Sequence, residues 1–338
     1  MYGKAFAPEY QGDLGSALSV NSSYEEVLAT ARRARDEAGS ARDRARAALA
    51  LAEANRRLGR SADARAAWHD SYRCAREAGD PAGMAWALWS GGTLARQCGA
   101  LRLARRLLSA SVAFADASGD RLAHGYALAG LAETGRIQGD YAAVAELHEQ
   151  LLRQARAHGE SRHVVWAMSG IAQMHRNSGD HATALELFTE CVRIASEADD
   201  ARGRAWSLRG MADVLSLRGS TDRALALLTQ AESVCREMEL AGALAYNLKM
   251  RGNVLFRAGR YEEACAAYEV ALSAFRDMDE ARGAALARLG LARSRFRRGR
   301  PQGEALAELT ALDSEFERIG LRQARQTAAA FRAELLAA

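Results

Sequence analysis

Proline is scarce in this chain, which contains only three among its 338 residues, at positions 8, 81 and 301. Proline interrupts helices because it lacks a backbone N–H and clashes with the preceding turn. Pro81 and Pro301 fall where we expect helices to begin, and proline is tolerated there. Strand patterns are also missing, since no stretch alternates apolar and polar residues with a period of two. The sequence therefore predicts an all-α protein.

Long apolar runs and cysteine pairs are absent as well. No apolar run approaches the length of a transmembrane helix, so we expect no membrane association. The five cysteines are Cys74, Cys98, Cys191, Cys235 and Cys265. Their odd number and wide spacing, with no CxxC pair, predict free thiols in a reducing cytoplasm. Residues 1–22 lack a basic start followed by an apolar run, so they do not form a signal peptide. Because they also lack helical periodicity, we expect a flexible tail.

Catalytic and metal-binding motifs are missing too. The sequence contains no zinc-type spacing, P-loop, GxGxxG, HExxH or nucleophile elbow, and we expect neither a cofactor nor a metal. Five of the seven histidines lie between residues 148 and 181, but no two are four residues apart. Among them, His175 falls at a position where we expect core packing, so we predict that it is buried. The enzyme class remains open, although no recognisable catalytic motif supports it.

Charge of one sign does not dominate the chain. The 46 basic and 42 acidic residues leave a net charge of +4, and Lys4 and Lys249 are the only lysines. Residues 293–300 are basic enough to contact a nucleic acid, but with a net charge of only +4 over the whole chain a solvated helix end explains them better. No DNA-binding motif precedes the repeats described below, and we do not expect a nucleic-acid partner.

Glycine recurs every 40 residues, and this spacing is the strongest pattern in the chain. The series is Gly59, Gly99, Gly139, Gly179, Gly219, Gly259 and Gly299. A second set of turn signals lies midway between these positions: Gly39-Ser40, Gly79-Asp80, Gly119-Asp120, Gly159-Glu160, Asp199-Asp200, Glu239-Leu240, Asp279-Glu280 and Ile319-Gly320. Glycine ends helices because it adopts the left-handed conformation without steric cost. Two stops in each repeat predict two helices of about 17 residues.

These stops predict a single array without a linker, because each repeat of a solenoid packs only on its neighbours. We expect the solenoid to cover residues 23–338. A flanking helix at 23–38 would precede seven helical pairs, and a closing helix at 321–338 would follow them. The predicted repeats are 41–80, 81–120, 121–160, 161–200, 201–240, 241–280 and 281–320.

Individual residues within the repeats resemble the tetratricopeptide pattern W-x2-L-G-x2-Y followed by A-x3-F. The matching stretches are Met168-x2-Ile171-Ala172-x2-His175 with Ala184-x3-Phe188, Leu248-x2-Arg251-Gly252-x2-Leu255 with Ala264-x3-Tyr268, and Leu128-x2-Leu131-Ala132 with Val144. The turns Gly139-Asp140-Tyr141, Gly179-Asp180-His181 and Gly259-Arg260-Tyr261 resemble the Gly-Asp-Tyr turn of that family. The resemblance covers about residues 41–320. It implies a right-handed superhelix in which the first helix of each pair lines the concave face.

The repeats depart from the family in two respects. They are six residues longer than its 34-residue unit, and the terminal proline is missing. Longer repeats of this kind are similar to those of kinesin light chains and of bacterial peptide-sensing or regulatory tetratricopeptide proteins. A HEAT or armadillo array, whose repeats also run near 40 residues, is the alternative architecture, and the Gly-Asp-Tyr turn argues against it.

The register of the resemblance places three columns of side chains on the concave face. The aromatic column is Trp86, Tyr126, Trp166, Trp206 and Tyr246. The polar column is Glu53, Thr93, Glu133, Gln173, Asp213, Asn253 and Arg293. The third column is Arg56, Arg96, Arg136 and Arg176, followed by Ser216, Phe256 and Phe296. Because positions three, four or seven apart share a helix face, each repeat presents an aromatic, a polar and a third side chain along one stripe.

Each column also has a structural explanation. The aromatic rings could equally pack between repeats. For the arginines the structural explanation is the stronger one, because they lie in the last helical turn and within reach of Glu53 and Glu133. The polar column is therefore the better candidate for binding. Glycines inside the helices, at Gly91-Gly92, Gly130, Gly170, Gly210 and Gly290, indicate close helix packing more than space for a ligand.

The candidate binding residues are Trp86, Trp89, Tyr126, Glu133, Arg136, Trp166, Gln173, Arg176, Trp206, Arg209, Asp213, Tyr246 and Asn253. Amides and carboxylates can hydrogen-bond a peptide backbone, and arginine clamps carboxylates or phosphates. The leading hypothesis is an adaptor that binds a peptide or protein, acidic or with a C-terminal carboxylate, in its groove. A regulator that senses a peptide or small molecule is the first alternative. An enzyme with its active site in the groove is the second.

Overall fold

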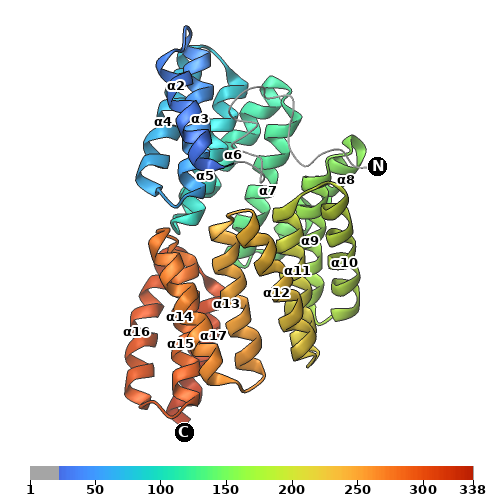
Figure 1. Ribbon diagram of the computed structural model, residues 1–338, viewed down its shortest axis with the longest axis vertical. Coiled ribbons are helices and arrows are strands. Elements are labelled where there is room, and N and C mark those ends of the chain that lie inside the picture. Colours follow the sequence, from blue (N-terminus) through green and yellow to red (C-terminus); the bar gives the residue numbers. More distant parts are fainter. Residues whose placement is uncertain (1–22, 338) are drawn as a thin grey trace.

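The computed structural model describes residues 23–337, and sixteen helices, α2 to α17, account for nearly all of them (Figure 1). No strand occurs within these residues. The flanking helix is α2 (Tyr24–Asp36). The first helices of the seven pairs are α3 (Ala41–Arg57), α5 (Pro81–Gln97), α7 (Arg121–Gln138), α9 (Ser161–Ser178), α11 (Ala201–Leu217), α13 (Ala241–Arg257) and α15 (Ala281–Arg297). The second helices are α4 (Ser61–Glu77), α6 (Leu101–Ser118), α8 (Tyr141–His158), α10 (His181–Glu197), α12 (Thr221–Glu237), α14 (Tyr261–Asp277) and α16 (Gln302–Ile319). The closing helix is α17 (Arg322–Ala337).

Left-handed residues end the helices at the predicted positions. Gly59 has φ +78° and Gly99 φ +80°, a conformation that glycine adopts without steric cost. Where the sequence has Asp199, Glu239 and Asp279 in place of glycine, these residues take the same conformation, with φ of 54°, 50° and 51°. The helices of the pairs are 17 or 18 residues long. The 40-residue pattern therefore places helix ends correctly even where glycine is replaced.

The ends of the array differ slightly from the prediction. Helix α2 is shorter than the predicted 23–38, and α17 begins one residue later than predicted. Pro81 is the first residue of α5, whereas Pro301 immediately precedes α16. The predicted tail, residues 1–22, lies outside the described residues.

The interior glycines let second helices pack closely on first helices. A Cβ added at Gly210 would lie 2.3 Å from the ring of Phe188, and one added at Gly170 would lie 2.1 Å from the ring of His148. Leu108 and Tyr268 lie against Gly130 and Gly290 in the same way. These large side chains occupy the A-x3-F position of the repeat, so close packing explains the glycines, as the sequence predicted.

The two ends of the array contact each other. Leu101 at the start of α6 and Ile137 near the end of α7 belong to one apolar cluster with residues of α15, α16 and α17. A Cβ at Gly59 would approach Met278 to 3.0 Å, and one at Gly99 would approach Ile319 equally closely. The first three repeats therefore pack against the last two and the closing helix. We call this contact the closing seam.

One buried position was predicted wrongly. His175 is partly exposed, with 38% of its side chain accessible, and its Nδ1 lies 3.0 Å from a carboxylate oxygen of Asp180. It lies in the last turn of α9. In the described residues, no helix is both long enough and apolar enough to cross a membrane.

Candidate functional site

A cavity of about 740 Å³ runs along the concave side of the array. The first helix of every pair, from α3 to α15, contributes to its wall. Tyr24 of α2 and Thr327 of α17 also border it, so both ends of the array reach the same space. This volume falls within the range of roughly 300–1,000 Å³ that is typical of ligand sites.

Twelve of the thirteen candidate binding residues line this cavity. They are Trp89, Tyr126, Glu133, Arg136, Trp166, Gln173, Arg176, Trp206, Arg209, Asp213, Tyr246 and Asn253. Trp86 does not line the cavity, because its side chain is fully buried. Its indole N–H donates to a carboxylate oxygen of Asp120 at 2.8 Å, and its ring packs on Trp89 and Tyr126. The prediction that Trp86 contacts a ligand directly is therefore wrong, because the ring fills the space between adjacent repeats.

The aromatic column combines packing with exposure to the cavity. Tyr126 makes edge contacts with Trp89 and Trp166, at centroid distances of 5.1 and 5.4 Å. Trp206 and Tyr246, further along the array, are half-buried. Edge-to-face contacts of this kind hold rings rigidly. The part of the cavity wall formed by α5, α7 and α9 is consequently aromatic and rigid.

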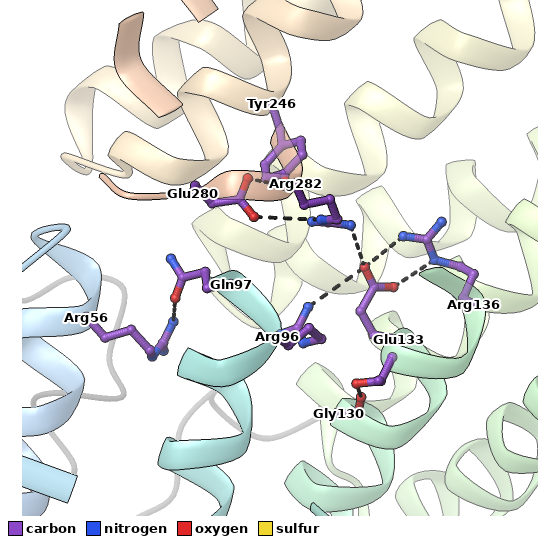
Figure 2. A network of polar contacts seen from close by, with 10 residues as sticks. Arg56, Arg96, Gln97, Gly130, Glu133, Arg136, Tyr246, Glu280 and Arg282 are labelled. Carbon is purple, nitrogen blue, oxygen red and sulfur yellow. Dashed lines mark hydrogen bonds and ion pairs between the residues drawn. The ribbon is translucent and has the colours of Figure 1, made fainter. Parts of the chain in front are cut away.

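Glu133 is the centre of an arginine cluster that joins the two ends of the array (Figure 2). Its carboxylate accepts hydrogen bonds from Arg136 on the same helix, both at 2.7 Å. The guanidinium groups of Arg96 on α5 and Arg282 on α15 lie 3.9 and 3.7 Å away. Burial would raise the pKa of Glu133, but Arg136, Arg282 and Arg96 outweigh it and hold the pKa at about 2. A carboxylate held in this way remains ionised and is unsuited to proton transfer near neutral pH.

Arg282 connects this cluster to a second carboxylate. Its guanidinium lies 3.7 Å from Glu280 and 4.8 Å from the ring centre of Tyr246. The hydroxyl of Tyr246 donates to Glu280 at 2.8 Å (Figure 2). Because Arg282 belongs to the seventh repeat and Glu133 to the third, this pair spans the closing seam.

The remaining arginines of the third column also pair with acids. Arg56 donates to the buried Glu53 at 2.6 Å. Asp213 is bound by Arg176 of the preceding repeat and by Arg257 at 2.8 Å. These contacts confirm the expectation that the column forms ion pairs. Its members nevertheless face the cavity, so their charges also act on whatever occupies it.

Four basic side chains on the cavity wall have no ion-pair partner within the described residues. They are Arg202, Arg209, Lys249 and Arg293. Burial, together with repulsion from Arg57 and Arg56, lowers the pKa of Arg202 to about 9. Burial lowers the pKa of Lys249 to about 8, and burial also lowers the pKa of Arg209 and Arg293. The cavity therefore holds positive charge that the protein itself does not neutralise.

Over the whole wall, basic side chains outnumber acidic ones, in agreement with these unpaired positive charges. Eleven basic residues line the cavity: Arg56, Arg57, Arg96, Arg136, Arg176, Arg202, Arg209, Lys249, Arg257, Arg282 and Arg293. Four acids face them: Glu133, Asp213, Glu239 and Glu280. The surplus of seven positive charges exceeds the net charge of +4 of the entire chain. An anionic ligand would be attracted to this space.

Arg202, Lys249 and Arg282 were not among the candidate residues, although the sequence contained a signal for each. Arginine occupies the second position of α9, α11 and α15, as Arg162, Arg202 and Arg282. Lys249 is one of only two lysines, and it stands 40 residues after Arg209. The 40-residue register could have revealed both sets. It could not have shown that Arg282 reaches Glu133, because that contact depends on the curvature of the whole array.

The described residues contain no group of three His, Cys, Asp or Glu side chains that could hold a metal ion. The amides and the aromatic rings suit a peptide backbone and its side chains, and the arginines suit carboxylates. His148 lies under Gly170, and burial lowers its pKa to about 4, so it is neutral at pH 7.

Comparisons with known proteins agree with this architecture. A tetratricopeptide-repeat family model matches residues 163–237. These residues are tetratricopeptide repeats, and the same 40-residue helical pair continues on both sides of them. A model for anaphase-promoting complex subunit 5 matches residues 18–97. No curated protein matches the chain in sequence.

Solved structures share the fold over most of the chain. A Rap protein in complex with Competence and Sporulation Factor has a TM-score of 0.63 and 13% identity, covering 93% of this chain and 92% of the other. The Rap conjugation regulator of plasmid pLS20, in complex with the Phr* peptide, has a TM-score of 0.65 and 11% identity, covering 82% and 74%. NprR with its cognate peptide NprX has a TM-score of 0.61 and 13% identity, covering 85% and 84%. At these identities the likeness shows the fold, and it favours the tetratricopeptide solenoid over a HEAT or armadillo array.

Proposed function

We propose that this protein is a regulator that senses a short peptide by binding it in the cavity. The observation that carries the proposal is the single cavity wall, built from seven consecutive first helices and lined by aromatic, amide and basic side chains. The three structures cited above support it, because each is described with a bound peptide or signalling factor. A sensor thus takes precedence over a general adaptor.

The size and closure of the cavity favour a short peptide over a folded partner. A volume of about 740 Å³ lies within the range of roughly 300–1,000 Å³ that is typical of small-ligand sites. The closing seam also limits access for a folded domain, since Leu101 and Ile137 pack on the C-terminal helices. We propose a cytoplasmic location because all five cysteines are free thiols.

The charge of the wall favours a peptide that is acidic or that is bound by its C-terminal carboxylate. Arginine and lysine outnumber the acids on the wall, and several of them lack a counter-ion among the described residues. Gln173 on α9 and Asn253 on α13 both line the cavity, and their amides can hydrogen-bond peptide groups. Nucleic acid would need an open basic surface to track its backbone, which this narrow cavity does not provide.

A randomised pool of short peptides with free C-terminal carboxylates tests the proposal. Selected peptides should bind with micromolar affinity in calorimetry, and Gln173→Ala should weaken them at least tenfold. Gln173 is the cleanest position, because its side chain makes no hydrogen bond within the described residues, whereas Asp213 holds Arg176 and Arg257. Arg251→Gln is the matched control, since Arg251 pairs with Glu232 away from the cavity.

Solution scattering separates a sensor from a passive adaptor. A sensor should change its radius of gyration when a selected peptide is added, because small rotations between repeats accumulate along a solenoid. Binding without any change in radius would favour the adaptor. The peptide-binding proposal is wrong if no member of the pool binds, or if peptides bind Gln173→Ala and wild type equally.

A further inference from the structure

We propose that His148 forms a polar subsite on the cavity wall, which binds a neutral ligand group that both donates and accepts hydrogen bonds. In a peptide, this group is the carboxamide of Asn or Gln or the hydroxyl of Ser or Thr, and this assignment rests on the function proposed above. His148 belongs to α8, a second helix. Its side chain lines the cavity, although only 5% of the residue is accessible.

The cavity reaches beyond the first helices at only two places. In the described part of the chain, the second-helix residues that line it are His148 and Leu151 on α8 and Tyr268 on α14. The first helices that contact α8 both carry glycine on the cavity wall, Gly130 on α7 and Gly170 on α9. A Cβ at Gly170 would lie 2.1 Å from the imidazole ring, so the ring packs directly against the backbone of α9.

The equivalent residues of other repeats show that packing does not require a histidine at this position. The position recurs every 40 residues, and its occupants in six repeats are Trp68, Leu108, His148, Phe188, Leu228 and Tyr268. Phe188 packs against Gly210 as closely as His148 does against its own glycine, and the phenyl ring carries no polar atom. The hydroxyl of Tyr268 donates to Oδ1 of Asn253 at 2.8 Å, so this polar occupant is satisfied within the protein.

Both ring nitrogens of His148 lack a hydrogen-bond partner within the described residues. The charged side chains that act on the ring are Glu133 and Arg136, which are hydrogen-bonded to each other. Buried polar atoms without partners are unfavourable, and native proteins retain few of them. The imidazole therefore costs stability that an apolar side chain at this position would not, and a hydrogen-bonding ligand group would offset this cost.

The imidazole is suited to a neutral partner. Burial lowers the pKa of His148 to about 4, against the opposing effect of Glu133, so the ring carries one N–H donor and one nitrogen acceptor at pH 7. A carboxamide or a hydroxyl can pair with either nitrogen, whichever of them carries the proton. A carboxylate can pair only with an N–H, and burial opposes the charged imidazolium that would bind it strongly. The amide of Gln173, one turn after Gly170 on α9, lines the same cavity and can bond the same ligand group.

Nitrogen-15 NMR of the imidazole rings tests the subsite directly. The chain contains seven histidines, and His148→Phe identifies the signals of His148 by their loss. Without ligand, these signals should be those of a neutral ring at pH 7, because the pKa is about 4. Saturation with selected short peptides should move the signal of at least one ring nitrogen in the direction that hydrogen bonding produces, while the ring stays neutral.

Pairs of isosteric peptides identify the ligand group. Each polar side chain of a selected peptide is replaced in turn, Gln by Met, Asn by Leu, Ser by Ala and Thr by Val. At the position that contacts His148, the replacement should weaken binding at least tenfold, because the imidazole is left unpaired. Loss with Gln or Asn assigns a carboxamide, and loss with Ser or Thr assigns a hydroxyl. If the selected peptides instead carry Asp or Glu there and raise the pKa of His148, the assignment of a neutral group is wrong.

Substitution of the histidine should remove this preference. His148→Phe should bind both peptides of the isosteric pair with equal affinity, and His148→Leu repeats the test with a smaller side chain. Both should fold, since Phe188 and Leu108 occupy the equivalent position, and circular dichroism checks this. His158→Phe, at the exposed end of α8 and outside the cavity, is the matched control and should keep the preference. If the two His148 variants also keep it, water satisfies the imidazole and the subsite is wrong.

Failure of the subsite and failure of the peptide function give different results. If peptides bind while the signals of His148 are unchanged, the subsite is wrong and the peptide function stands. Acetamide is a probe that does not depend on peptides, because it is a free carboxamide. If no peptide binds but acetamide shifts the signals of His148 and not those of the other histidines, the subsite stands and the peptide function is wrong. Unchanged His148 signals with every probe overturn the subsite.

Discussion

The two halves of the cavity wall treat positive charge differently. From α3 to α9, the five arginines on the wall all lie within ion-pair distance of an acid: Arg56, Arg57, Arg96, Arg136 and Arg176. From α11 to α15, four of the six basic residues lack such a partner among the described residues, and only Arg257 and Arg282 have one. The first half therefore uses its charges to hold the repeats together, and the second half leaves charges available to a ligand.

This difference separates two roles that a single repeat position can take. Paired charges stabilise the ligand-free protein, and removing one partner leaves the other charge without a counter-ion. Unpaired charges destabilise the empty protein, so they are retained at a cost that ligand binding would offset. Substitutions in the two halves should consequently change stability in opposite directions.

The largest effect is expected in the paired half, for Glu133→Gln. This change leaves Arg96, Arg136 and Arg282 close together without an anion, and it weakens the closing seam. We expect a loss of about 3 kcal/mol in the free energy of unfolding, typical of a broken buried pair. Urea unfolding measures it. The control is Glu149→Gln on α8, whose exposed pair with Arg153 should contribute no more than about 0.5 kcal/mol. Equal effects at the two sites would contradict the role of Glu133.

The low pKa of Glu133 also predicts that the free energy of unfolding falls in acid, by an amount similar to the loss in Glu133→Gln. Glu133 has a pKa of about 2, below its ordinary value of 4.5. Its stabilisation is therefore complete above pH 4.5 and is lost as pH falls from 4.5 towards 2, by up to about 3 kcal/mol. The difference in unfolding free energy between wild type and Glu133→Gln should shrink over this window. A constant difference down to pH 2 would show that Glu133 is not held ionised by the arginines.

A substitution at a contact between a first and a second helix tests whether the difference between the two halves of the wall comes from charge. Gly210→Ala places a Cβ within 2.3 Å of the Phe188 ring, and we expect a loss of about 2 kcal/mol from overpacking. Its pH dependence should match that of the wild type. Gly303→Ala on α16 is the matched control, because a Cβ there meets nothing within 4 Å. It should gain up to about 1 kcal/mol from helix propensity. Thermal unfolding distinguishes the two signs.

The smallest and opposite effect is expected for Lys249→Met in the unpaired half. Burial holds the Lys249 pKa at about 8, below its ordinary value of 10.5, so the charged form is disfavoured in the folded state. A shift of this size corresponds to at most about 3 kcal/mol. Because the Lys249 side chain is only partly buried, solvent screening reduces the expected gain in stability of the variant at pH 7 to about 1 kcal/mol. Between pH 8 and 10.5 the unfolded wild type binds a proton that the folded protein does not. Wild-type stability should therefore rise over this window, and the advantage of the variant should disappear. A destabilised variant at pH 7 would show that Lys249 has a structural partner.

Much of the fold was predictable because the information is local. Left-handed conformations at Gly59, Gly99 and their counterparts follow from the glycine spacing, and the helices between them follow from composition. The repeat register even located Asp199, Glu239 and Asp279, which take the same conformation without glycine. His175 was predicted wrongly, since its side chain turns to Asp180 at the end of the helix, and the repeat pattern does not show this contact.

The candidate site was predictable in part for the same reason. The three columns alone placed ten of the twelve lining candidates on one wall, because equivalent positions in a solenoid face the same side. They could not distinguish Trp86, which is buried between repeats, from Trp166 and Trp206, which border the cavity. That distinction depends on how closely adjacent repeats approach each other.

The two halves of the cavity wall differ in a property that is not local. By itself, the sequence determined the helices, their ends, the 40-residue register and the identity of the columns, because each depends on neighbouring residues or on a strict repeat. Only the tertiary structure decided which charges are paired. Glu133 meets Arg282 across 149 residues of chain because the curvature of the array closes its ends on each other. Such curvature accumulates from small rotations between repeats, which no single residue specifies.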